Sequence, residues 1–153
     1  MNPPPWTLRS AVAADLEVLA ELRAAVLRSD LERLGRYDEH RVRQRLRDSF
    51  SPAHTSIILS SGDLAGSITL RPDTDGRQLL EHFYLDPRLQ GRGLGSAVLK
   101  TVLDRADSRD QTVGLDVLQG SAARRLYERH GFVVESEDPI DVFMVRTPRG
   151  RHG

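Results

Sequence analysis

Residues Leu85 to Ser96 read LDPRLQGRGLGS and are the most informative part of this sequence. A strand-like run from Leu79 ends at Asp86-Pro87, three glycines follow at alternate positions, and apolar residues then recur at helical spacing from Leu94 to Ser108. Glycines let neighbouring backbone amides turn inward, and the amino end of a helix adds partial positive charge. The stretch therefore predicts a loop that holds a pyrophosphate; the alternative is a glycine-rich turn that binds no ligand.

Two common nucleotide-binding loops do not match this stretch. The dinucleotide-binding fingerprint needs a glycine three residues after Gly93, where this sequence has Ser96. The P-loop ends in Gly-Lys-Ser/Thr, whereas the single lysine of the chain, Lys100, lies inside the predicted helix. Taken alone, the loop sequence does not identify the ligand.

The rest of the chain alternates strand and helix patterns. Strand patterns cover residues 7–11, 55–59, 64–70, 79–85, 112–118, 132–134 and 141–145, and helix patterns cover residues 16–27, 38–50, 94–108 and 121–130. Gly131 fits the left-handed cap at the end of the last helix. This mixed order predicts one α/β or α+β domain over residues 1–147, and the Arg- and Gly-rich residues 148–153 are expected to form a flexible tail.

Composition excludes several classes of function. Basic and acidic residues number 22 each and are spread evenly, so no basic face for nucleic acid is predicted. No apolar run approaches the ~20 residues that cross a bilayer, and no signal-peptide pattern is visible, so a soluble cytoplasmic protein without membrane contact is expected. The chain has no cysteine, and its 5 histidines lack metal-binding spacing, so neither a thiol nucleophile nor a metal site is expected.

Two motifs together resemble the GCN5-related N-acetyltransferase (GNAT) family. Gln90 to Gly95 reads QGRGLG, which is similar to the Q/R-x-x-G-x-G/A loop of that family, and Ala123 to Phe132 reads ARRLYERHGF, which is similar to its A-x-x-L-Y-x-x-x-G-F signature. The resemblance implies a GNAT-like fold with a mixed, mostly antiparallel central sheet of six or seven strands flanked by about four helices. It also implies an N-acetyltransferase that transfers an acetyl group from acetyl-CoA to a primary amine of a small molecule or peptide.

The resemblance implies how acetyl-CoA is held. In the family the fourth and fifth strands splay apart around the pantetheine arm, often with the help of a bulge. Backbone groups of Phe83 and Leu85 are then expected to contact the pantetheine. The other expected cofactor contacts are Gln90, Gly91, Arg92, Gly93, Leu94, Gly95 and Ser96 around the pyrophosphate, together with Ala123.

The sequence departs from the family pattern at Gly120. The family often has asparagine at this place, seven residues before Tyr127, where its side chain bonds the cofactor or the helix start. Either the cofactor is positioned more loosely here, or Gln119 or Ser121 compensates.

Attack by an amine needs a base, because an alkyl amine has a pKa of ~10 and is mostly protonated at neutral pH. Glu81 is the first candidate, since it lies four residues before Leu85, where the resemblance often places a base acting directly or through water. The alternative is a strand glutamate that faces solvent or pairs with an arginine. His82 is secondary, because strand alternation places it with Leu80 and Tyr84 on the side opposite Glu81.

Tyr127 matches the family tyrosine, which donates a hydrogen bond or a proton to the departing thiolate of coenzyme A; the alternative is an aromatic packing position. Without cysteine, direct attack in a ternary complex is the simplest mechanism, with the Leu85 amide as donor to the thioester oxygen. The amine is expected near residues 30–39, where Tyr37, Asp38 and Glu39 would receive a cation unless Asp38 serves as a helix N-cap.

Two other function classes remain open. A noncatalytic domain that binds or senses acyl-CoA would keep the glycine loop without needing Tyr127 or Glu81. A purely structural domain would have no affinity for the cofactor. The oligomeric state is also open, a homodimer being one option.

Overall fold

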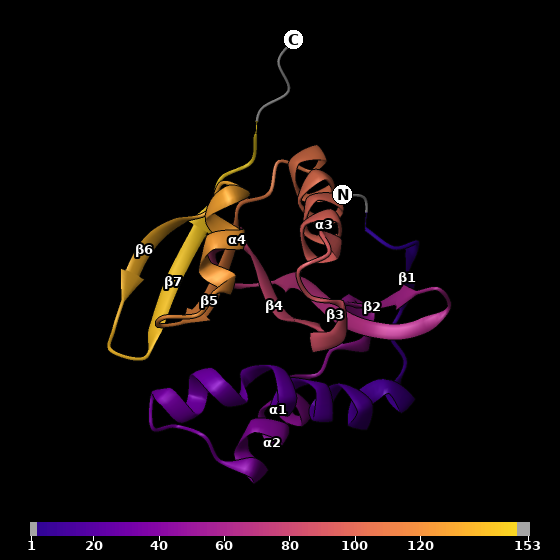
Figure 1. The fold of residues 1–153 in the computed structure, drawn as a ribbon. Coiled ribbons are helices and arrows are strands. Elements are labelled where there is room, and N and C mark those ends of the chain that lie inside the picture. Colours follow the sequence, from indigo (N-terminus) through magenta and orange to yellow (C-terminus); the bar gives the residue numbers. More distant parts are fainter. Residues whose placement is uncertain (1–2, 150–153) are drawn as a thin grey trace. The chain divides into compact units, whose positions relative to one another are not determined.

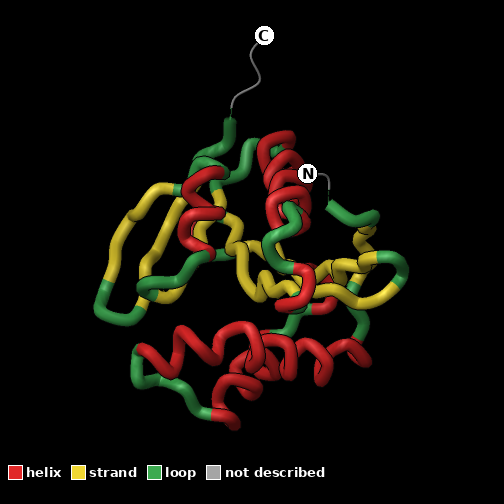
Figure 2. Tube along the Cα trace, viewed as in Figure 1, coloured by secondary structure: helices red, strands yellow, loops and turns green. Residues whose placement is uncertain are grey.

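The computed structural model describes residues 3–149, which contain seven strands and four α-helices (Figures 1 and 2). The strands are β1 (Trp6–Ser10), β2 (Thr55–Ser60), β3 (Asp63–Pro72), β4 (Gln78–Leu85), β5 (Val113–Leu118), β6 (Val133–Glu137) and β7 (Asp141–Arg146), and the helices are α1 (Leu16–Arg33), α2 (Glu39–Ser49), α3 (Leu94–Ser108) and α4 (Ala123–Arg129). The strand order is β1-β2-β3-β4-β5-β7-β6, with β4 parallel to β5 and antiparallel pairing at β1/β2, β2/β3, β5/β7 and β6/β7. The predicted mixed, mostly antiparallel sheet is confirmed.

The predicted elements are found, with shifts at their ends. Helix α1 continues to Arg33, beyond the predicted end at residue 27, and Gly35 follows it with a φ of 70°. The hairpin between β2 and β3 turns at Ser61 and Gly62, which both have positive φ. Gly131, with a φ of 94°, ends α4 as expected.

The chain divides into two compact units. The described residues of unit 1 lie within Met1–Thr69 and His82–Gly95, and those of unit 2 lie within Leu70–Glu81 and Ser96–Gly153. Strands β3 and β4 and helix α3 each contribute residues to both. None of the helices in residues 3–149 combines the length and apolarity that a bilayer crossing requires.

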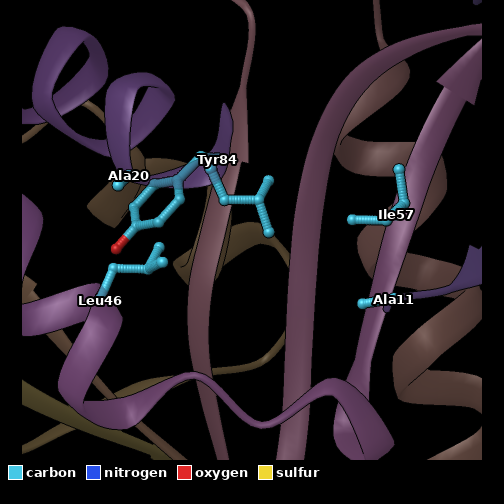
Figure 3. Packing of buried hydrophobic residues seen from close by; sticks show 6 residues of the cluster. Ala11, Ala20, Leu46, Ile57 and Tyr84 are labelled. Atoms are coloured by element: carbon cyan, nitrogen blue, oxygen red, sulfur yellow. The ribbon is translucent and has the colours of Figure 1, made fainter. Parts of the chain in front are cut away.

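The core of unit 1 forms between its sheet and its two helices. Buried side chains from α1, α2, β2, β4 and the residue after β1 meet there: Ala11, Leu19, Ala20, Leu46, Ile57 and Tyr84. Figure 3 shows the Tyr84 ring beside Ala20 and Leu46. Helix α2 buries Val42 and Leu46, four residues apart, as its sequence pattern predicts, and its Arg43 and Arg47 pair with Glu21 and Glu17 of α1.

In unit 2, β5, β7 and β6 form an antiparallel set, with Val113 opposite Arg146 and Leu118 opposite Asp141. Helix α3 contributes Val98, Leu99 and Ala106 to the buried residues, as its spacing predicts. A partly buried ion pair joins this helix to β7, since the Arg146 guanidinium donates to the Asp107 carboxylate at 2.7 Å.

The Arg149 backbone amide also donates to the Asp107 carboxylate, at 3.0 Å. The predicted flexible tail covered residues 148–153, and its last four residues, 150–153, lie outside the described residues.

Candidate functional site

The second half of β4 contains an unusual backbone conformation at His82. Its φ is 48°, in the left-handed region that residues other than glycine seldom adopt. The regular alternation predicted across residues 79–85 is therefore wrong at this position, because a left-handed residue interrupts the pleat. The expected shared side of His82 and Tyr84 is confirmed, since their rings lie 5.8 Å apart and His82 Nδ1 is 3.0 Å from the Tyr84 hydroxyl.

The peptide groups that follow His82 have a definite direction. The Tyr84 carbonyl lies against Gly66 of β3, and the Asp86 amide donates to the Ala65 carbonyl of the same strand at 2.7 Å. Peptide groups of successive strand residues point to opposite sides. The N–H and C=O groups of Phe83 and Leu85 therefore point away from β3. This direction is the one that two backbone positions need in order to hold an extended ligand.

The glycine loop begins where β4 ends. Asp86 accepts from the Arg88 amide at 2.9 Å and from its guanidinium at 2.7 Å, and the side-chain bond to Arg88 holds the pKa of Asp86 below its ordinary value. The Gln90 side-chain amide donates to the Leu85 carbonyl at 3.2 Å. The loop is thus tied at its start to the strand that precedes it.

Gly91 and Gly93 both adopt left-handed φ values, 76° and 80°, immediately before α3 begins at Leu94. Only glycine adopts this conformation at little cost, which explains two of the three loop glycines. The first amides of a helix have no partner within it and carry partial positive charge. The loop and helix start therefore form the arrangement that favours an anion such as a pyrophosphate.

Helix α4 of unit 2 begins two residues later and ends one residue earlier than the predicted helix over residues 121–130. The Ala123 amide donates to Ser121 Oγ at 3.2 Å, so Ser121 supplies the bond at the helix start that Gly120 lacks. Gln119 instead donates to Glu137 and to the Asp138 carbonyl, both at 2.9 Å. Of the two compensating residues considered for the helix start, Ser121 makes the contact.

Tyr127 is buried, with 8% of its surface exposed, and its ring packs edge-on against Phe132 at 5.7 Å. The packing that was the alternative to an acid role is therefore present. A packed phenol can still donate a proton, so the role of Tyr127 as an acid stays a prediction.

Glu81 makes the arginine contact that was the alternative to a base role. Its Oε2 accepts from Arg71 Nε at 2.5 Å, and the two side chains are 19% and 33% exposed. This hydrogen bond raises the pKa of Arg71 above its ordinary value. The role of Glu81 as the base stays a prediction.

Ser96 is joined to a residue that the sequence did not single out. Its hydroxyl lies 2.9 Å from His130 Nε2, at the end of α4. Burial, followed by the charges of Arg129 and Arg146, lowers the pKa of His130 below its ordinary value. The neutral imidazole is thereby favoured beside the predicted phosphate contact.

Two of the three residues suggested for the amine, Tyr37 and Asp38, have other partners. Asp38 accepts from the Arg41 amide at 2.8 Å and so caps α2, the alternative considered for it, and this bond lowers the pKa of Asp38. The Tyr37 ring lies under the Arg28 guanidinium at 4.9 Å, and Glu39 is the first residue of α2. Within residues 3–149, no three His, Asp or Glu side chains gather where they could hold a metal ion.

The predicted site residues fall into two sets. Phe83, Leu85 and the loop residues from Gln90 to Gly95 belong to unit 1, where Leu85 and Gln90 are in contact. Glu81, Ser96, Ala123 and Tyr127 belong to unit 2. Arg71 and His130 are partners of this second set that sequence reasoning missed.

Comparison with known proteins gives consistent results. The model of the acetyltransferase (GNAT) family matches residues 19–132. A spermine/spermidine N(1)-acetyltransferase of Bacillus subtilis (strain 168) is 34% identical over 86 residues, covering 50% of this chain and 57% of the relative. The match thus spans little more than half of that relative's length.

Solved structures share the fold. The PaiA N-acetyltransferase of Thermoplasma acidophilum in complex with coenzyme A aligns with a TM-score of 0.75 at 21% identity, covering 94% of this chain and 99% of that one. The ribosomal-protein-S18-alanine N-acetyltransferase of Escherichia coli aligns with a TM-score of 0.71 at 20% identity, covering 97% of each chain.

Proposed function

The chain belongs to the acetyltransferase (GNAT) family, and we propose that it is an enzyme that transfers an acetyl group from acetyl-CoA to a primary amine. The observation that supports this most is the pair of left-handed glycines, Gly91 and Gly93, directly before the amino end of α3. This arrangement suits the diphosphate of acetyl-CoA. The Phe83 and Leu85 peptide groups, which point away from β3, suit the extended pantetheine arm.

The proposed reaction is direct attack in a ternary complex. The amine nitrogen forms a bond to the thioester carbon, the carbon–sulfur bond breaks, and the thiolate of coenzyme A leaves. In this proposal the Leu85 amide donates to the thioester oxygen as it gains charge. Tyr127 gives its phenol proton to the leaving thiolate. The thiol of coenzyme A has a pKa of ~8.5, below that of a phenol, so the transfer depends on a dry site that favours it.

Glu81 is the proposed acceptor of the amine proton. Its Oε2 already accepts from Arg71, so a route through an intervening water fits the contact better than direct transfer. No residue forms a covalent acyl intermediate in this scheme, and none of its steps uses a metal.

The identity of the amine substrate has to be determined by experiment. The Bacillus subtilis relative is named for spermine and spermidine, so polyamines come first in a substrate panel. Free amino acids, aminoglycosides and peptides with a free amino terminus complete it. The expected cytoplasmic location and the option of a homodimer also stay predictions, which cell fractionation and sedimentation would check.

The test combines binding with turnover. Calorimetric titration is expected to show acetyl-CoA binding, and release of free coenzyme A is expected to depend on one of the amines. Binding without release on any amine would favour the noncatalytic acyl-CoA-binding alternative. An absence of binding would contradict both functions.

A further inference from the structure

A chain of hydrogen-bonded side chains ties β4 to both helices of unit 1. His82 Nε2 lies 2.7 Å from the hydroxyl of Ser49 at the end of α2, and His82 Nδ1 lies 3.0 Å from the Tyr84 hydroxyl. The Tyr84 oxygen accepts from Nε of Arg23 in α1 at 2.8 Å, and Arg23 Nη1 donates to the Val42 carbonyl at 2.6 Å.

The direction of each bond in this chain follows from counting protons. The Ser49 hydroxyl donates its single proton to the Arg45 carbonyl at 2.7 Å, so toward His82 it acts as acceptor. His82 therefore donates from Nε2, which leaves Nδ1 as the acceptor of the Tyr84 proton in the neutral ring. Both ring nitrogens are used within unit 1, so the imidazole is held in one orientation.

The backbone at His82, like its ring, is held by contacts with neighbouring elements. Its carbonyl accepts from Ser67 Oγ at 2.8 Å, and two residues later the Tyr84 carbonyl lies against Gly66. A left-handed residue other than glycine costs free energy, and it persists only where its surroundings hold it. Here β3 holds the backbone of His82 and α2 holds its side chain.

We propose that His82 is a positioning residue for acetyl-CoA. The hydrogen bond from His82 to Ser49 fixes the imidazole, the fixed imidazole keeps the left-handed turn in β4, and that turn sets the direction of the Phe83 and Leu85 peptide groups. His82 acts through the backbone and not by taking the proton of the amine. The inference rests on the proposed function, because it concerns the groups assigned to the pantetheine and thioester.

The experiment removes the hydrogen bond from His82 to Ser49 and measures two quantities. In the full chain, Ser49→Ala deletes the acceptor of His82, Ser49→Thr restores a hydroxyl, and His82→Asn loses the ring while tolerating the left-handed backbone. Ser51→Ala is the matched control, because Ser51 makes the same kind of contact with His54, at 2.8 Å, on an exposed part of unit 1. The readouts are the Kd for acetyl-CoA and the amide hydrogen exchange of Phe83 and Leu85.

Loss of one hydrogen bond of ordinary strength is expected to raise the Kd about fivefold in Ser49→Ala and to speed exchange at both amides. His82→Asn should do the same, whereas Ser49→Thr and Ser51→Ala should stay near the wild type. Unchanged exchange in Ser49→Ala and His82→Asn, or faster exchange with an unchanged Kd, would overturn the positioning role. If the wild type binds no acetyl-CoA, the proposed function fails first, and the exchange rates then show separately whether the turn depends on Ser49.

Discussion

Gly66 and Tyr84 approach so closely that no side chain fits between them, since a Cβ on Gly66 would lie 2.0 Å from the Tyr84 carbonyl oxygen. This approach lets β3 support β4 just beyond His82. The strand that carries the proposed pantetheine contacts is thus positioned by this close approach, which a side chain at residue 66 would prevent, as well as by hydrogen bonds.

Gly66→Ala is expected to displace β4 and to lower the free energy of unfolding by about 2 kcal/mol, in the range of other overpacked sites. Denaturant unfolding would measure this loss. Gly114→Ala is the control, because its Cβ would meet only the Met144 carbonyl oxygen at 3.8 Å, an ordinary contact. Equal stability of the two variants would contradict the close approach.

Gly91→Ala is expected to weaken acetyl-CoA binding through backbone strain alone. Nothing lies within 4 Å of a Cβ built there, but the φ of 76° would cost an alanine about 1 kcal/mol. Gly35→Ala is a matched control, with a φ of 70°, open space and a position outside the loop. Both variants should lose similar stability, and only Gly91→Ala should raise the KM for acetyl-CoA.

Tyr127→Phe is expected to lower kcat about a hundredfold with little loss of stability, because it removes the proposed proton donor and keeps the ring that packs on Phe132. Steady-state kinetics and thermal unfolding would measure the two effects. Full turnover in this variant would contradict the proton-donor role of Tyr127 and would show that its ring serves only in packing.

The base and ion-pair roles of Glu81 are separated by two variants. Glu81→Gln and Arg71→Gln each break the same contact, so a purely structural pair predicts similar behaviour for both. A base role predicts that Glu81→Gln lowers kcat by about a hundredfold while Arg71→Gln retains it. Equal kcat values would remove Glu81 from the mechanism.

The Asp107–Arg146 pair predicts a pH dependence of stability. The hydrogen bond from Arg146 lowers the pKa of Asp107 in the folded protein, so its stabilisation is present above the unfolded pKa of ~3.9 and is lost as the pH falls through the folded value. Asp107→Asn leaves Arg146 buried without this carboxylate and is expected to cost about 3 kcal/mol at pH 7. Urea titrations of both proteins should converge at low pH, and a constant difference would contradict the assignment.

Local patterns predicted much of the fold and part of the site. The bounds of α3 match at both ends, because apolar spacing and the preceding glycines are features of neighbouring residues. The positive φ values of Gly91, Gly93 and Gly131 follow from the same kind of local reasoning. The Asp38 cap was visible in the sequence as an alternative for the same reason.

Contacts between distant residues could not be predicted. Glu81 with Arg71 and Ser96 with His130 are separated by 10 and 34 residues, and no periodicity links their side chains. The left-handed backbone at His82 lies within a run that reads as a regular strand, and it depends on residues of α2 and β3. These residues of α2 and β3 come together with His82 only in the folded chain.

The proposed activity requires the amides from Gly91 to Gly95 to bind the diphosphate of acetyl-CoA at the start of α3. A crystal structure of the full chain with acetyl-CoA tests it most directly. We expect diphosphate oxygens within hydrogen-bonding distance of those amides, with the pantetheine arm along Phe83 and Leu85. A diphosphate bound elsewhere, or loop amides turned away and bonded within the protein, would contradict it.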